Sequence, residues 1–248
     1  MQINCNDRGN DTGFFCKIPF PDKCHQLRVL MTNNHVINKD DLKKDNKINF
    51  TINNDKLSFE IIIDEFRKIY TNKDYDITII EIKENDNLDM NSFLEIDDQI
   101  FNDNHNDIYR GKTIYLIGYP KGGKPKYANG LIKDINENTY DIRHFCRSEQ
   151  GWSGCRILNL NNNRVIGIHK GAAKKGQNWN LGTLLKEPIK DFKEKNIHNK
   201  NYKNNEYNYI KKVEKDCCNN IKDEIIIESL EFIKEQQKKD KIGILVHY

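Results

Sequence analysis

No apolar run in the 248-residue sequence reaches the roughly 18 residues that a transmembrane helix needs, so no membrane partner is expected. The first eight residues are polar and lack the apolar segment of a secretory signal, so we expect no such signal. These two absences leave the compartment open and favour the cytoplasm.

Cysteine spacings typical of metal sites are also absent. The seven cysteines are irregularly spaced, and no two of them form a C-x-x-C pair. This excludes a zinc ribbon, whose four ligands come from two such pairs. An odd number of cysteines without a secretory signal predicts reduced thiols rather than a disulfide framework.

A strong excess of one charge is missing as well. The chain has 40 Lys and Arg residues against 37 Asp and Glu residues, a formal net charge of +3. No dense stripe of basic residues falls on any expected element. We therefore expect no nucleic-acid partner.

Short apolar runs bounded by turn residues fill the chain from Thr12 to about Leu185, without helical periodicity between them. Such a pattern predicts an antiparallel all-β fold, closed or sandwiched. The expected strands are Gly13–Ile18, Leu27–Thr32, Ile48–Ile52, Leu57–Ile63, Ile77–Ile82, Thr113–Tyr119, Tyr127–Ile135, Tyr140–Ile142, Arg156–Leu158 and Val165–His169.

The pattern changes near the C-terminus. Residues Glu187–Lys195 predict a short helix, with Pro188 suited to its first turn. The Asn- and Lys-rich residues 196–205 predict a linker. Apolar residues then recur at helical spacing and predict an amphipathic helix over 221–239, which we expect to dock on the main domain or on a partner. They are Ile221, Ile225, Leu230 and Ile233.

The stretch GWSG at residues 151–154 places Ser153 between two glycines, the surroundings that a serine nucleophile needs beside backbone N–H donors. A hydroxyl is a weak nucleophile near neutral pH and needs a general base. Histidine suits that role because its pKa lies near working pH, and a carboxylate then fixes its tautomer. His35 follows one apolar run and Asp76 heads another, so the order is His, Asp, Ser.

Six motifs in sequence order carry a family resemblance. They are GFF at 13–15, TNNHVI at 32–37, DITIIEI at 76–82, GYP at 118–120, GWSG at 151–154 and VIGIH at 165–169. Over about residues 11–192 the chain resembles the trypsin-like (chymotrypsin-fold) serine peptidases, especially their disulfide-poor, glutamyl-endopeptidase-like branch. The resemblance implies two antiparallel six-stranded β-barrels with the active site between them. The expected domains are a peptidase domain at 1–195, its barrels meeting near 105–112, and a C-terminal helical extension at 196–248.

The resemblance also implies roles. His35 is the general base, Asp76 its orienting carboxylate and Ser153 the nucleophile, with the N–H groups of Gly151 and Ser153 as the oxyanion hole. Asp74 and Asp64 remain alternative carboxylates. The implied activity is that of a serine endopeptidase acting on peptides or proteins through an acyl-enzyme. This chemistry needs no metal or organic cofactor, and we expect none.

Residues near the serine are expected to set substrate preference. The resemblance places Ser148 near the floor of the specificity pocket and His169 on its wall, followed by Lys170 and Gly171. A hydroxyl and an imidazole can both donate to a carboxylate or amide oxygen. We therefore expect cleavage after Glu or Gln.

The chain departs from the family at three positions around the nucleophile. Trp152, Cys155 and Arg156 stand where the relatives usually have small or apolar residues. The alternative interpretation is therefore a catalytically impaired protease-fold module that binds peptides or regulates a partner. A cysteine hydrolase using Cys155 or Cys146 is disfavoured, because Ser153 holds the nucleophile position.

Overall fold

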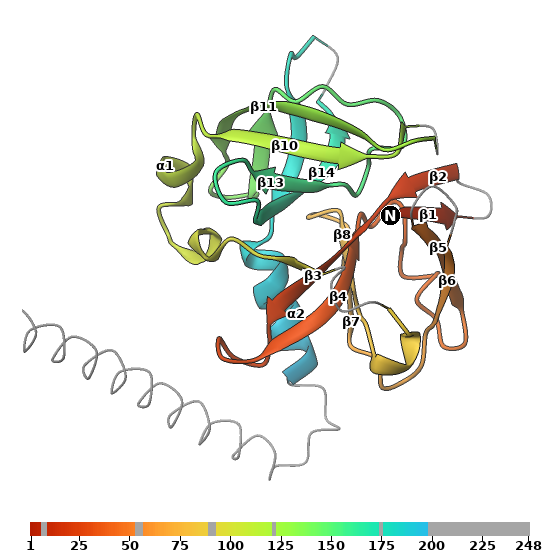
Figure 1. Ribbon diagram of the computed structural model, residues 1–248. Helices are drawn as coiled ribbons and strands as arrows, with labels where there is room; N and C mark the ends of the chain where they lie inside the picture. Colours follow the sequence, from red (N-terminus) through yellow and green to blue (C-terminus); the bar gives the residue numbers. More distant parts are fainter. Residues whose placement is uncertain (6–8, 53–56, 89–92, 121–122, 174–175, 198–248) are drawn as a thin grey trace, which may run out of the picture.

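The computed structural model describes residues 1–5, 9–52, 57–88, 93–120, 123–173 and 176–197. In these ranges the chain is mostly β-structure, arranged as two halves (Figure 1). A closed barrel forms the C-terminal half, and two sheets form the N-terminal half. The all-β class predicted from the sequence is confirmed.

The N-terminal half contains two sheets, whose strands pair in the antiparallel direction except at β9. The first has the order β2-β1-β5-β6 and the second β7-β8-β4-β3-β9. The strands are β1 (Gln2–Cys5), β2 (Gly9–Thr12), β3 (Phe14–Pro19), β4 (Gln26–Thr32), β5 (Lys47–Ile52), β6 (Leu57–Ile62), β7 (Ile69–Asn72), β8 (Ile77–Glu81) and β9 (Leu94–Glu95). The short β9 pairs with β3 in the parallel direction.

This half differs in pairing from the six-stranded barrel that the family resemblance implies. Its described strands form two hydrogen-bonded sheets, and both contribute side chains to one apolar core. The chain crosses between the sheets at Gly13, where an added Cβ would lie 2.7 Å from the Ile3 side chain. Glycine therefore permits the close approach of β1 at this corner.

The C-terminal half is a closed six-stranded barrel with the order β10-β11-β12-β15-β14-β13. Buried residues, which alternate along β10 and β12, fill its interior, and the same apolar cluster continues into the N-terminal half. The strands are β10 (Thr113–Gly118), β11 (Lys126–Ile135), β12 (Asp141–His144), β13 (Arg156–Asn159), β14 (Val165–Ala172) and β15 (Asn180–Leu184). All ten strands expected from the sequence are present, with small shifts at their ends.

Helices are few in the described ranges. They are η1 (Glu84–Asp86), η3 (Asp98–Phe101), α1 (His105–Tyr109) and α2 (Lys186–Ile197). The expected barrel boundary near 105–112 includes α1, and the division into domains stays a prediction. None of the described helices is long and apolar enough to cross a membrane.

Helix α2 packs against β7 and buries Ile189 and Phe192 completely (Figure 1). The Tyr70 hydroxyl of β7 donates to Asp191 of α2 at 2.9 Å. The helix extends two residues into the segment predicted as a linker, because Asn196 is buried and donates to the Phe192 carbonyl at 2.8 Å. The amphipathic helix predicted at 221–239 lies outside the described residues.

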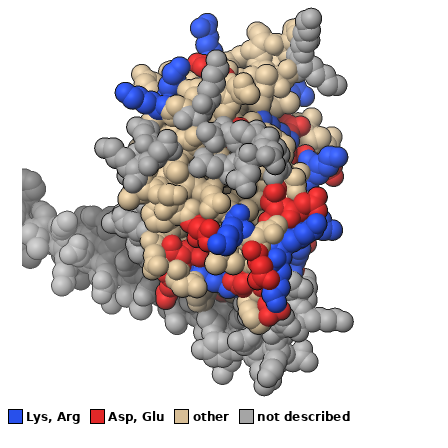
Figure 2. Space-filling view, turned by 90° about the vertical axis from the view of Figure 1, so that its right-hand side faces the viewer, with Lys and Arg blue, Asp and Glu red and all other residues tan. Residues whose placement is uncertain are grey.

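Charges of both signs are interleaved on the surface. On the face in Figure 2, Lys and Arg side chains lie next to Asp and Glu side chains in the lower part of the view. An exposed pair of this kind joins β5 to β6, where Lys47 lies 3.1 Å from Glu60. Such exposed pairs contribute little to stability.

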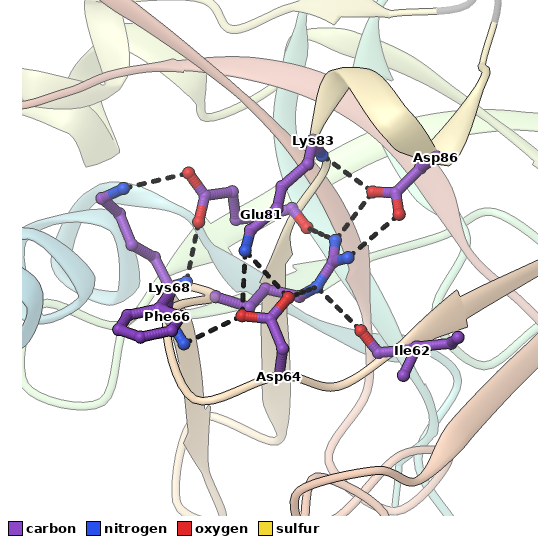
Figure 3. A network of polar contacts seen from close by, with 8 residues as sticks. Ile62, Asp64, Phe66, Lys68, Glu81, Lys83 and Asp86 are labelled. Carbon is purple, nitrogen blue, oxygen red and sulfur yellow. Dashed lines mark hydrogen bonds and ion pairs between the residues drawn. The ribbon is translucent and has the colours of Figure 1, made fainter.

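A buried ionic network ties η1 to the strands of the N-terminal half (Figure 3). The Arg67 side chain is 2% exposed, and its Nη1 and Nη2 donate to Asp86 at 2.7 and 2.9 Å. Arg67 also donates to the carbonyls of Glu81 and Ile62, at 2.7 and 3.1 Å. Both charges are therefore paired in a site that excludes most water.

Candidate active site

His35 and Asp76 come together because of the pairing between β4 and β8. Thr32 at the end of β4 lies opposite Thr78 near the start of β8, so the residues that flank these ends are neighbours. His35 Nδ1 lies 2.8 Å from Asp76 Oδ2, and the His35 backbone N–H donates to Asp76 Oδ1 at 3.0 Å. Because a carboxylate only accepts, the imidazole proton is on Nδ1 and Nε2 is left as the basic nitrogen.

The Asp76 backbone is held in an uncommon conformation. Its φ of 50° lies in the left-handed region, and its carbonyl accepts a hydrogen bond from Asn33 at 2.8 Å. Of the alternative carboxylates, Asp64 is bound to Lys83 at 2.8 Å. The carboxylate that hydrogen-bonds to His35 in this structure is therefore that of Asp76.

Two carboxylates affect the protonation of His35. The hydrogen bond to Asp76 raises the His35 pKa, burial opposes that effect, and the charges of Asp76 and Asp11 add to it. Burial in turn raises the pKa of Asp11. His35 consequently keeps a proton to higher pH than an isolated histidine.

The loop that carries Ser153 is shaped by two glycines and several backbone hydrogen bonds. Gly151 and Gly154 have φ values of 91° and 80°, which favour glycine. The Gly154 N–H donates to the His169 carbonyl at 3.0 Å, which joins the loop to β14. Within the described part of the chain, the N–H groups of Gly151 and Ser153 donate to no other residue. These are the two donors that the sequence predicts for the oxyanion hole.

The Ser153 hydroxyl does not complete the chain of hydrogen bonds. Its Oγ donates to the Lys170 carbonyl at 3.4 Å, and no hydrogen bond to His35 is present among the described residues. The structure thus joins two of the three expected catalytic side chains directly.

The bulky Trp152 does not occupy the space beside the serine. Its side chain is 3% exposed and packs on Gly118 of β10, where an added Cβ would lie 2.8 Å from the indole ring. Arg156, another position where the chain departs from the family, is buried without full hydrogen bonding. Its buried Nε has no hydrogen-bond partner, and burial lowers the pKa of its guanidinium.

His169 is paired with a second histidine that the sequence analysis missed. The two imidazoles meet at 3.2 Å between His169 Nδ1 and His144 Nε2. Burial lowers the pKa of His169 to about 3 and that of His144 to about 4, so both are neutral at pH 7. Ile142 and His144 alternate with less buried residues on β12, and this spacing was the sequence signal that could have placed His144 inside the barrel.

The other expected pocket residues have separate partners. Asn180 Nδ2 donates to Ser148 Oγ at 3.1 Å and to the Cys146 carbonyl at 2.7 Å. The Lys170 ammonium is bound to Asp141 at 2.6 Å, so its charge is largely compensated. Gly171 has a φ of 152° at the point where the register of β14 and β15 shifts.

The model of the trypsin-like peptidase domain family matches residues 12–168. The chain belongs to this family. Its fold is similar to that of the serine endoprotease from Yersinia pestis, with 16% identity, a TM-score of 0.55 and coverage of 79% of this chain and 62% of that one. The chain therefore spans less than two thirds of that protein. An inactive form of Rv3671c from M. tuberculosis has 17% identity, a TM-score of 0.55 and coverage of 80% and 86%.

At such identities the likeness to solved structures shows the fold alone. This trypsin-like peptidase domain keeps the expected order of His35, Asp76 and Ser153, while its place in the glutamyl-endopeptidase-like branch stays a prediction. The described ranges hold no group of three or more His, Cys, Asp or Glu side chains placed to bind a metal ion. Sequence reasoning also missed Thr12 and Asn180, which contact the Ser153 loop and Ser148.

Proposed function

We propose that this trypsin-like peptidase domain is a serine endopeptidase. The observation that carries the proposal is the hydrogen bond from His35 Nδ1 to Asp76, which leaves Nε2 as a base. Ser153 Oγ attacks the carbonyl carbon of the peptide bond while its proton passes to His35 Nε2. The developing oxyanion accepts hydrogen bonds from the N–H groups of Gly151 and Ser153.

The tetrahedral intermediate then collapses, the C–N bond breaks, and His35 gives its proton to the leaving amine. Water, deprotonated by the same imidazole, attacks the acyl-enzyme ester and releases the acid with Ser153 restored. The rotation of the Ser153 hydroxyl away from Lys170 fits this scheme, because catalytic hydrogen bonds often tighten only in the substrate complex.

The test is covalent labelling of the folded chain with a fluorophosphonate. We expect labelling of the wild type, none of Ser153→Ala, and a large loss in His35→Ala. Ser58→Ala is the matched control, because Ser58 is exposed on β6, away from the Ser153 loop. Labelling that persists in Ser153→Ala, or a folded wild type that does not react, argues against this function.

The substrate preference proposed is for glutamine or glutamate before the cleaved bond. Because Asn180 donates to Ser148 Oγ, the proton of that hydroxyl is free to point elsewhere. His169 Nδ1 lies 3.2 Å from His144 Nε2, and the Nε2 atom of His169 is the second group that we propose to meet a substrate oxygen. A neutral imidazole compensates a buried carboxylate poorly, which favours the amide of glutamine over glutamate.

Peptides that differ only in the residue before the cleaved bond test this preference. We expect kcat/KM to fall in the order Gln, Glu, then Lys, Arg and Phe. His169→Ala is expected to remove the advantage of Gln while fluorophosphonate labelling of Ser153 continues. A preference for Lys or Arg in the wild type contradicts the proposal.

A second candidate function is a peptide-binding module without turnover. The contact of Ser153 Oγ with the Lys170 carbonyl favours it, since the hydroxyl is then turned away from its base. Saturable peptide binding by a folded chain that neither labels nor hydrolyses would support this candidate over the peptidase.

A further inference from the structure

We propose that Thr12 is a positioning residue that fixes the Ser153 loop relative to the end of β4, where His35 follows. The inference rests on the proposed function, because it concerns the geometry of that catalytic site. Thr12 is the last residue of β2, and its side chain is completely buried. All of its hydrogen-bonding groups are used, and their partners come from three separate segments of the chain.

The backbone of Thr12 links the two halves of the molecule. Its N–H donates to the Ser153 carbonyl at 2.9 Å. Its carbonyl accepts a hydrogen bond from Thr32 Oγ1 at 2.9 Å, at the end of β4. Because Thr32 lies three residues before His35, Thr12 is a direct connection between the base-bearing turn and the nucleophile loop.

The side chain of Thr12 adds a second connection. Its hydroxyl donates to the Gly151 carbonyl at 2.8 Å and accepts the Tyr119 N–H at 3.2 Å. A hydroxyl can donate and accept at once, whereas the similarly shaped valine can do neither. The Thr12 side chain therefore fastens the start of the loop to the end of β10.

These bonds fix the peptide groups on both sides of the serine amide. The Gly151 and Ser153 carbonyls are both bound to Thr12, and the Trp152 carbonyl between them accepts the Cys155 N–H at 3.0 Å. The loop also packs tightly on this region, since an added Cβ at Gly154 would lie 2.6 Å from Thr32 Oγ1. Thr12 thus orients the loop segment that presents the proposed oxyanion donors.

Three variants test the role of the hydroxyl. Thr12→Val removes it while keeping the β-branched shape, and Thr12→Ser keeps it. Thr113→Val is the matched control, because Thr113 lies at the opposite end of β10 from Tyr119. If Thr12→Val does not fold, Thr12→Cys takes its place as a weak donor and acceptor of similar size.

We expect Thr12→Val to lower kcat by about 10- to 100-fold, the range associated with a misplaced catalytic group. KM should change by less than about threefold, because the Thr12 hydroxyl bonds to Gly151 and Tyr119 and not to the proposed pocket residues. Thr12→Ser should recover most of the lost kcat. A merely structural role predicts instead that Thr12→Ser and Thr12→Val behave alike once both are folded.

Amide hydrogen exchange gives a readout that does not need activity. We expect peptides covering residues 147–156 to exchange faster in Thr12→Val than in the wild type, Thr12→Ser or Thr113→Val. A folded Thr12→Val with unchanged exchange in this segment and unchanged kcat overturns the inference. A wild type that does not react with fluorophosphonate counts against the proposed function alone, and hydrogen exchange then decides the role of Thr12.

Discussion

The buried pair of Arg67 and Asp86 provides a quantitative test of how the N-terminal half is stabilised. The two side chains are 2% and 7% exposed and are joined by two hydrogen bonds, at 2.7 and 2.9 Å. Replacing Asp86 with alanine leaves the guanidinium buried, with Asp64 as its nearest remaining carboxylate at 3.8 Å. We expect Asp86→Ala to lower the free energy of unfolding by about 3–5 kcal/mol, the range for removing one partner of a buried ion pair.

The matched control is Asp40→Ala. Asp40 lies 3.0 Å from Lys43, but the two side chains are 82% and 69% exposed, so its loss should change the stability little. Urea unfolding followed by far-UV circular dichroism is suitable, because both tryptophans, Trp152 and Trp179, lie in the C-terminal half. Repeating the measurement at high salt should leave the Asp86 effect largely unchanged, since buried charges are poorly screened.

If Asp86→Ala and Asp40→Ala destabilise the chain equally, the buried pair of Arg67 and Asp86 does not stabilise the N-terminal half as proposed. The double variant Arg67→Met with Asp86→Leu sharpens the test, because replacing both charges with apolar side chains is often neutral or stabilising. It should therefore recover much of the stability that Asp86→Ala loses.

Three further predictions concern the candidate site. Asp11→Asn should lower the His35 pKa and move the acid limb of the kcat/KM profile to lower pH, because one nearby negative charge is lost and a neutral His35 is needed as base. Asp103→Asn is the control, and an unmoved limb contradicts the prediction. Arg156→Met should raise the free energy of unfolding by about 1–3 kcal/mol in denaturant titrations, since it removes a buried Nε without a partner. Gly154→Ala should abolish fluorophosphonate labelling, because the φ of 80° at this position disfavours alanine. The added Cβ would also collide with Thr32 and with the Thr12 carbonyl. Normal labelling of this variant would contradict the prediction.

Local sequence patterns determined most of the β-structure. Short apolar runs bounded by turn residues indicate strands, so β4 and β8, which bury four and five consecutive residues, could be found from sequence. Their pairing then places His35 beside Asp76, which agrees with the partner expected from the order of motifs. The missed strands β1 and β2 have four residues each and few apolar ones, so they carry little of this pattern.

Tertiary structure alone decided what surrounds the candidate nucleophile. Trp152 could have filled the space beside the serine, but the absence of a side chain at Gly118 lets the indole pack on β10. Thr12 contacts Gly151 across 139 positions of sequence, and no local pattern encodes such a contact. The sequence by itself determined the residue types of the proposed triad and most of the strands beside which they lie. Only the folded chain determined that two of them are hydrogen-bonded while the Ser153 hydroxyl points to Lys170, because rotamers depend on neighbours that packing brings together.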